Sequence, residues 1–157
     1  MNAVEFSRDN LDVALSWIDP MTRSSTGWIN LEPVPLEEVV SARPSLLGSL
    51  FSSRGPVVPL ITWLTPNPKT GRSGYEQIGV MHCQGQQISK RLGDFGVSLP
   101  DRWTVRQDHP SRGLVINKPT DSENRSTLIW LLDFGEAISG VDLTGTWTVE
   151  PHEIPKS

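Results

Sequence analysis

The sequence contains one cysteine, Cys83, among 157 residues, so no disulfide can form within the chain. Small secreted domains usually carry several cysteines. The longest apolar run, around Val57–Leu64, is far shorter than the roughly 18 residues that a membrane-spanning helix needs. The N-terminus has no positively charged segment followed by an apolar stretch. These absences predict a cytoplasmic protein with no signal peptide and no membrane partner.

Blocks of like charge are also missing from the chain. It has 14 basic and 18 acidic residues, which give a formal net charge of −4. A general nucleic-acid binder usually carries a clustered cationic surface, so this balance argues against a nucleic-acid partner. A chain of this length buries enough surface to fold without a disulfide or a metal. We also expect no cofactor.

The pattern of apolar residues predicts little regular structure in the first third of the chain. Leu11, Ala14, Leu15 and Ile18 recur at helical spacing and predict a short helix, Asp9–Asp19, which Pro20 ends. A short strand at Trp28–Leu31 is a further candidate. The region from residue 33 to residue 53 gives no clear pattern.

The second half of the chain is more regular. Runs rich in β-branched and aromatic residues predict strands at Val57–Thr65, Tyr75–Cys83, Trp103–Asp108, Leu114–Asn117 and Gly145–Glu150. Helical spacing predicts helices at Gln84–Phe95 and Ser126–Ser139. In the second helix Gly135 costs about 1 kcal/mol relative to alanine, and a strand at Thr127–Leu132 is the alternative.

This order of elements predicts an α+β fold. Residues 1–157 are expected to form a single domain, with a helix and an irregular part in residues 1–55. Residues 56–150 follow the order β-β-α-β-β-α-β. Hairpins followed by helices favour an antiparallel sheet of about five strands, with two to three helices packed mainly on one face.

Cys83 is the residue most suggestive of catalysis, because it lies where a predicted strand meets a predicted helix. A helix N-terminus lowers the pKa of a thiol and favours the nucleophilic thiolate. The local sequence HCQGQQISKR resembles the phosphatase signature H-C-x5-R, but Ser89 occupies the arginine position and Arg91 comes two residues later. The alternative interpretation is a buried, inert cysteine, which we favour.

An enzyme built on Cys83 would need a base, for which His109 and Asp108 are the candidates. His82 is next to the thiol, but successive strand residues point to opposite faces of a sheet. The three histidines, His82, His109 and His152, show no metal-binding spacing, so we expect no metal site.

The predicted hairpin tip gathers polar groups that could bind a ligand. A small anionic ligand or an acidic partner is expected to contact Arg106, Asp108, His109 and Arg112, with Trp103 nearby. A solvated turn is the simpler interpretation of the same residues. A nucleic-acid-associated regulator would combine two of these arginines with the loop at Pro66–Gly74, in one patch of Lys69, Arg72, Arg106 and Arg112.

Six tryptophans are many for this length, and each lies in or beside a predicted element. Most are expected in the core, although tryptophan is also enriched at interfaces. The apolar stretch Leu46–Phe51 could dock on another chain, and a homodimer is one form that such docking could take.

Several short sequence motifs lie between Gly27 and Trp147 and follow one another in a characteristic order. They include Gly27-Trp28, Arg54-Gly55-Pro56, Val58-Pro59-Leu60, Gly79-Val80, His82, Trp103, Gln107-Asp108-His109-Pro110, Arg112-Gly113-Leu114-Val115 and Trp130-Leu131-Leu132. In these motifs and their order, the chain resembles an uncharacterised family of small bacterial, actinobacterial-like proteins. The resemblance implies one complete domain and carries no activity, cofactor or catalytic residue.

No set of nucleophile, base and oxyanion donors emerges from the sequence, nor does a metal or phosphate motif. We therefore expect an intracellular binding or protein-interaction module without catalytic chemistry. A small thiol-dependent hydrolase or transferase using Cys83 is the alternative, and a nucleic-acid-associated regulator is a further one.

Overall fold

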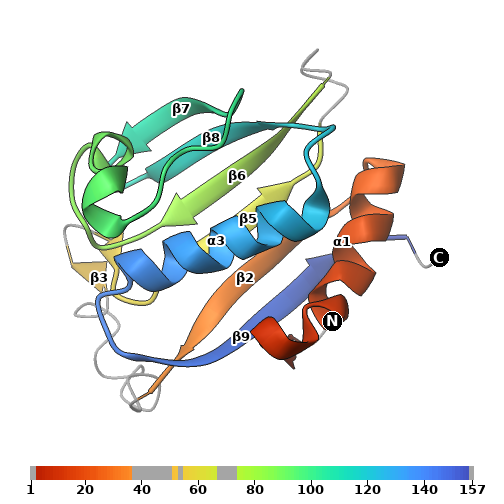
Figure 1. The fold of residues 1–157 in the computed structure, drawn as a ribbon, viewed down its shortest axis with the longest axis horizontal. Helices are drawn as coiled ribbons and strands as arrows, with labels where there is room; N and C mark the ends of the chain where they lie inside the picture. Colours follow the sequence, from red (N-terminus) through yellow and green to blue (C-terminus); the bar gives the residue numbers. More distant parts are fainter. Residues whose placement is uncertain (1–2, 37–50, 53–54, 67–73, 156–157) are drawn as a thin grey trace.

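A seven-stranded sheet organises the chain (Figure 1). The computed structural model describes residues 3–36, 51–52, 55–66 and 74–155. The strands of the sheet are β1 (Val4–Phe6), β2 (Trp28–Pro35), β5 (Leu60–Leu64), β6 (Tyr75–Met81), β7 (Thr104–His109), β8 (Gly113–Pro119) and β9 (Leu143–His152). A separate two-stranded sheet pairs β3 (Phe51–Ser52) with β4 (Gly55–Pro56).

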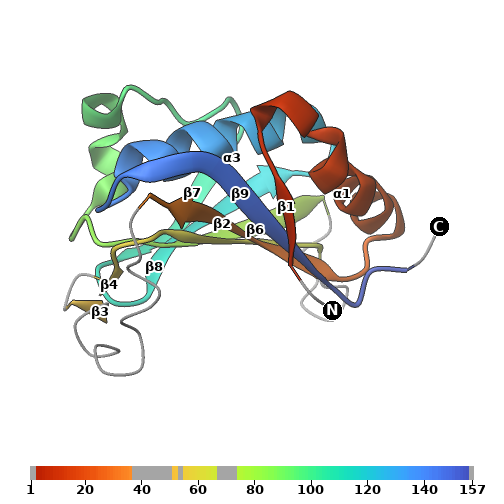
Figure 2. The same ribbon diagram turned by 90° about the horizontal axis from the view of Figure 1, so that it is seen from below.

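The large sheet has the order β1-β9-β2-β5-β6-β8-β7, and every neighbouring pair is antiparallel. Two α-helices, α1 (Asp12–Ser24) and α3 (Asn124–Ile138), lie on the same face of this sheet (Figure 2). Short 3₁₀ turns occupy Arg8–Asn10, Ile88–Lys90 and Leu92–Phe95. The predicted α+β class, with helices on one face, is therefore confirmed for the described residues.

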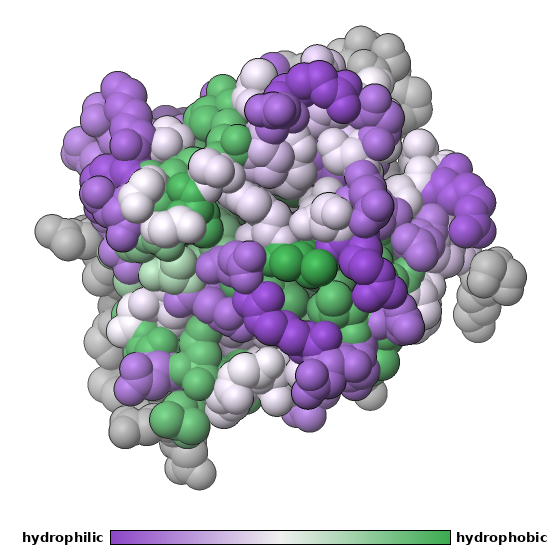
Figure 3. All heavy atoms as spheres, viewed as in Figure 1, coloured by the Kyte–Doolittle hydropathy of each residue, from purple (hydrophilic) through white to green (hydrophobic). Residues whose placement is uncertain are grey.

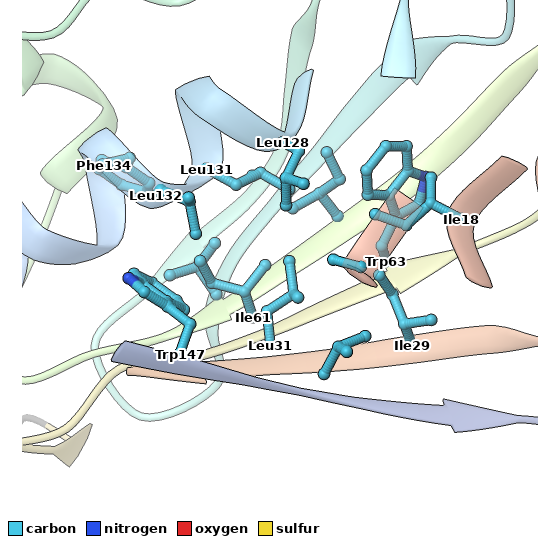
Figure 4. Packing of buried hydrophobic residues seen from close by; sticks show 14 of the residues in the cluster. Ile18, Ile29, Leu31, Ile61, Trp63, Leu128, Leu131, Leu132, Phe134 and Trp147 are labelled. Atoms are coloured by element: carbon cyan, nitrogen blue, oxygen red, sulfur yellow. The ribbon is translucent and has the colours of Figure 1, made fainter. Parts of the chain in front are cut away.

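The core lies between the helices and the sheet (Figure 4). Burial alternates along the central strands, so every second side chain faces the helices. The large side chains Trp63 and Trp147 are completely buried there, in the same cluster as aliphatic residues of α3 such as Leu131 and Leu132. Five of the six tryptophans belong to this core or pack against it: Trp17, Trp63, Trp103, Trp130 and Trp147.

The predicted number of about five strands is wrong, because the sheet has seven. The three residues of β1 are too few for periodicity to reveal a strand, and they pair with β9 from the other end of the chain. The strand β2 contains Pro33 and Pro35, which usually argue against a strand. A shift in register between these prolines accommodates them in the pairing with β9.

The helix predicted at Gln84–Phe95 is also wrong, since two 3₁₀ turns take its place. Gly85 and Gln87 have left-handed backbone conformations, with φ of 80° and 56°. Regular helix cannot pass through such residues, so no helix forms before Ile88. Arg91, with φ of −112° and ψ of 14°, then separates the turn that contains Ile88 from the turn that contains Leu92 and Phe95.

The prediction that Pro20 ends the first helix is wrong as well, because α1 continues to Ser24. An internal proline costs about 3 kcal/mol in helix formation. The neighbours Ile18 and Met21 are both fully buried, and their packing holds this turn of helix against the sheet. The helix predicted at Ser126–Ser139 is confirmed as α3, and the alternative strand there is wrong.

No helix in the described ranges is long and apolar enough to cross a membrane.

Candidate functional site

The segment that follows β6 contains the residues that the sequence singled out for catalysis. The strand ends at Met81, so His82 and Cys83 lie beyond it. His82 is 1% exposed, and its Nδ1 accepts a hydrogen bond from the backbone N–H of Gln84 at 3.1 Å. Because Nδ1 is an acceptor, the neutral ring carries its proton on Nε2. Among the described residues, Nε2 has no hydrogen-bond partner.

Burial lowers the pKa of His82 below its ordinary value. The carboxylate of Asp108 opposes this shift, whereas the guanidinium of Arg91 reinforces it. Because desolvation is the largest of these effects, the pKa of His82 is lowered and the imidazole stays neutral to a lower pH than an ordinary histidine. A neutral imidazole in this position can donate one proton from Nε2 and cannot pair as a cation.

Asp108 and Arg91 both hold the 3₁₀ turns in place. Asp108 Oδ2 accepts hydrogen bonds from the backbone N–H of Ser89, at 3.0 Å, and from its hydroxyl. Arg91 donates to the backbone carbonyls of Gln84 and Gln86. These contacts satisfy backbone groups that the irregular segment would otherwise leave without partners. The Asp108 contacts therefore fasten the turn at Ile88–Lys90 to β7, and the Arg91 contacts hold the segment that precedes this turn.

Cys83 is half-buried near the end of α3. Gly140 approaches it so closely that a Cβ at that position would lie 2.7 Å from the Cys83 Sγ. Gly140 also donates its backbone N–H to the carbonyl of Val57 at 2.8 Å. This packing leaves little room beside the sulfur on the side of Gly140.

The two bases proposed for Cys83 point in different directions. Asp108 pairs with Leu114 and His109 with Gly113, so these successive residues of β7 face opposite sides of the sheet. The Nδ1 of His109 accepts hydrogen bonds from the backbone N–H groups of Ser111 and Arg112, at 3.2 and 3.3 Å. His109 therefore stabilises the hairpin turn, and the two candidate bases lie on opposite sides of the sheet.

The ligand patch predicted at the same hairpin is spread over different surroundings. Trp103 is 6% exposed and packs edge-on against Trp130, with the ring centroids 5.1 Å apart. Arg106 and Arg112 are exposed on the surface. The nucleic-acid patch extends to Lys69 and Arg72, which lie outside the described residues, as does most of the stretch Leu46–Phe51.

Residues capable of binding a metal do not gather in the described part of the chain. No group of three or more His, Cys, Asp or Glu side chains there could hold a metal ion. An open groove of about 430 Å³ runs between α1 and the start of α3. Its polar side chains bond to one another, as Asn124 Nδ2 does to Asp19 Oδ1 at 2.9 Å, and Arg125 pairs with Asp12.

The face of the sheet opposite the helices offers a different kind of site. No described helix covers this face (Figure 2). Its side chains alternate along the strands with the buried ones. We call it the Trp28 face and define it by residues that follow one another across the strands in register. From β9 to β7 these are His152, Trp28, Leu64, Gln77, Asn117 and Thr104, with Glu150, Asn30 and Thr62 in the next row.

Trp28 and His152 form the aromatic end of this face. Their rings stack with centroids 4.9 Å apart and planes inclined by 9°. Beyond Trp28, the side chain of Leu64 is 38% exposed, and Tyr75 on β6 is 43% exposed. Tryptophan and tyrosine at an accessible surface are typical of protein-binding sites.

A chain of polar contacts fixes the stacked rings. His152 Nε2 lies 2.8 Å from Glu150 Oε1 and 3.4 Å from Asn30 Nδ2. The hydroxyl of Thr62 donates to Asn30 Oδ1 at 2.8 Å. The aromatic pair, a carboxylate and an amide are therefore held by three adjacent strands before any ligand arrives.

Sequence reasoning did not identify this face. It placed Trp28 on a short strand, but the pairing of Trp28 with His152 depends on a register between distant strands. The alternation of polar and apolar residues in β9, with Thr148, Glu150 and His152 on one side, was the available signal. That alternation predicts an accessible face without revealing its neighbours.

Comparison with protein-family models, with curated proteins and with solved structures found no match for this chain.

Proposed function

We propose that this chain is an intracellular binding module that recognises another protein through the Trp28 face and catalyses no reaction. The observation that carries the proposal is the preformed pair of Trp28 and His152, set on an accessible sheet face beside Leu64. Rigid aromatic side chains bind with little loss of conformational entropy, which is why they dominate binding energy at interfaces.

The surroundings of the cysteine support a role without catalysis. Asp108 bonds to Ser89, and His109 bonds to its own turn, so each candidate base already serves a structural contact. A thiol-dependent enzyme would need one of these groups directed at Cys83.

The two sides of the molecule also differ in character. On the helix-covered side, hydrophilic and apolar residues are interspersed (Figure 3). Charged side chains there pair with each other, as Arg8 does with Asp133 and Glu136 at 2.8 and 2.6 Å. On the Trp28 face, the central side chains are aromatic, apolar and uncharged polar groups, a composition that favours protein binding.

A photo-crosslinking experiment tests the proposal. A photoreactive amino acid replaces Gln77, in the middle of the face, or Ser16, an exposed residue of α1. The partner crosslinked from position 77 is identified, purified and titrated against the wild-type chain. We expect Gln77→Arg to weaken binding at least about tenfold, because it buries a new charge at the interface.

Ser16→Arg is the matched control, and we expect it to bind as the wild type does. Crosslinking from position 16 with equal yield, or unchanged affinity in Gln77→Arg, would contradict the assignment of the face. A second copy of this chain, recovered as the crosslinked partner, would make the interface a homodimer. Reaction of Cys83 with alkylating agents well below the normal thiol pKa would instead favour the thiol-enzyme alternative.

A further inference from the structure

We propose that the partner presents an arginine whose guanidinium stacks on the Trp28–His152 pair and bonds to the carboxylate of Glu150. This inference rests on the proposed function, because it specifies the chemistry of the partner at the Trp28 face. The occupant is an arginine-bearing protein segment, and three features of the face argue for it.

The first feature is the aromatic platform itself. The rings of Trp28 and His152 are stacked, with planes inclined by 9°, so each ring covers one face of the other and the pair offers its outer faces to a ligand. The faces of aromatic rings, those of tryptophan above all, attract cations. A planar guanidinium can lie flat on such a surface and keep its N–H groups free at the edges, whereas an ammonium group cannot.

The second feature is a carboxylate within reach of that platform. Glu150 Oε1 contacts His152 Nε2 at 2.8 Å, and the Glu150 side chain is 41% exposed. In the described structure, Oε2 of Glu150 takes part in no ion pair or hydrogen bond with a side chain. A guanidinium on the ring pair could therefore donate to Glu150, and a charge-assisted bond of this kind is about twice as strong as a neutral one.

The third feature is the sign of the surrounding charge. On β1, β9, β2, β5, β6 and β8, the described side chains that face away from the helices include Glu5 and Glu150 but no lysine or arginine. The one basic residue of these strands, Lys118, is fully buried on the helix-covered side. A cationic partner is therefore attracted to this face, and an anionic one is repelled.

The geometry of the site is also fixed in part before binding. The 2.8 Å contact between His152 Nε2 and Glu150 Oε1 holds the ring and the carboxylate together, and Asn30, which accepts from Thr62 at 2.8 Å, lies beside the edge of the ring. A preorganised site loses little entropy on binding, which benefits a weak single-residue contact most.

Nuclear magnetic resonance titration with defined peptides tests this inference. The probes are three otherwise identical uncharged peptides that carry a central arginine, lysine or glutamine. We expect the arginine peptide to shift the indole N–H resonance of Trp28, and to bind about fivefold more tightly than the lysine peptide. The glutamine peptide should produce no shift.

Two variants locate the contact. Glu150→Gln is expected to weaken the arginine peptide about fivefold, because it removes the charge from the acceptor. Asp94→Asn, which removes an exposed carboxylate from the 3₁₀ turn at Leu92–Phe95, should leave the affinity unchanged. Thermal unfolding of both variants checks that the fold is intact.

Equal binding of the arginine and lysine peptides, or an unshifted Trp28 resonance, overturns the arginine contact. If Gln77→Arg still abolishes binding of the crosslinked partner, the protein-binding function stands and only the chemistry of its partner is wrong. If the crosslinked partner tolerates Gln77→Arg, the interface itself is wrong and the arginine contact is overturned with it.

Discussion

Gly135 lies where α3 passes closest to the sheet. A Cβ at this position would be 2.5 Å from Cη2 of Trp147 and 3.3 Å from Cδ1 of Ile61. Helix propensity alone favours alanine over glycine by about 1 kcal/mol. The buried indole cannot move aside in a close-packed core, so we expect Gly135→Ala to destabilise the protein by about 1–3 kcal/mol. Urea unfolding measures the change.

Gly93 supplies the matched control for this substitution. A Cβ there would have no atom within 4 Å, so Gly93→Ala should leave stability near that of the wild type. A Gly135→Ala protein as stable as Gly93→Ala would show that α3 does not depend on the close approach to Trp147.

His82 gives stability a dependence on pH whose sign follows from its burial. Its pKa in the folded protein is lower than the ordinary value of 6.5, chiefly through desolvation. The unfolded chain therefore binds a proton first as the pH falls. The contribution to stability is complete above 6.5 and is lost as the pH falls from there toward the folded pKa.

The corresponding experiment measures the free energy of unfolding between about pH 7.5 and about pH 5. We expect wild-type stability to fall across this range, and His82→Asn to show a smaller slope from a lower starting value. His109→Asn is the control, since His109 lies in the hairpin turn, and it should keep the wild-type slope. A wild-type slope in His82→Asn would contradict the assignment.

Among the elements, β6 and β8 are joined by a buried ion pair. Glu76 lies opposite Lys118 in register, and Lys118 Nζ is 3.0 Å from Glu76 Oε1. The indole N–H of Trp63 donates to the same oxygen at 2.6 Å, and the Pro119 carbonyl accepts from Lys118 at 3.0 Å. Both charged side chains are almost completely buried, so each depends on the other.

We expect Lys118→Met to destabilise the protein by about 3–5 kcal/mol, because it leaves Glu76 charged and unpaired in the core. Adding Glu76→Gln should restore much of this loss, since the amide oxygen still accepts from Trp63 and carries no charge. A double-mutant cycle in urea unfolding measures the coupling. Additive losses in the two single variants would show that the pair is not coupled.

The ion pair of Arg102 and Asp121 is exposed, in contrast to the buried pair of Glu76 and Lys118. Its side chains are 65% and 68% exposed, so solvent screens their attraction. The bond still lowers the pKa of Asp121 through the hydrogen bond from Arg102. Asp121→Asn should nevertheless leave stability close to that of the wild type, which makes it the surface control for Lys118→Met.

At the scale of elements, the sequence predicted those helices and strands that local periodicity is enough to reveal. It placed α3 and most of the strands, since apolar residues recur at the period of each element. It missed the length of α1, where the burial of Ile18 and Met21 outweighs the effect of Pro20. It also could not predict that the left-handed Gln87 delays the start of the helical pattern to Ile88, or that Arg91, with φ of −112° and ψ of 14°, divides it into two 3₁₀ turns.

The candidate site was harder to predict because it depends on pairing between distant strands. Trp28 and His152 are neighbours only through the register of β2 with β9. Glu76 and Lys118 likewise meet only because β6 pairs with β8. Local patterns place such residues on a strand, but they do not determine which strand lies beside it.

For the whole molecule, the two edges of the sheet decide how it can associate. The edge strand β1 has only three residues, and the edge strand β7 shifts register between Val105 and Gln107. Arg106 lies in that irregularity and is exposed. Short strands, bulges and charges are the devices that prevent edge-to-edge pairing, so association should use the face of the sheet rather than its edges.

Arg106→Val therefore tests the edge of the molecule. It removes the charge beside Val105, which is already 41% exposed, and leaves an apolar edge strand. We expect this variant to form oligomers as its concentration rises, as measured by size-exclusion chromatography with light scattering. Arg112→Val removes the same charge from the adjoining turn and should keep the wild-type mass. Equal masses for the two variants would mean that the register shift alone blocks the edge, because the charge of Arg106 would then add nothing to it.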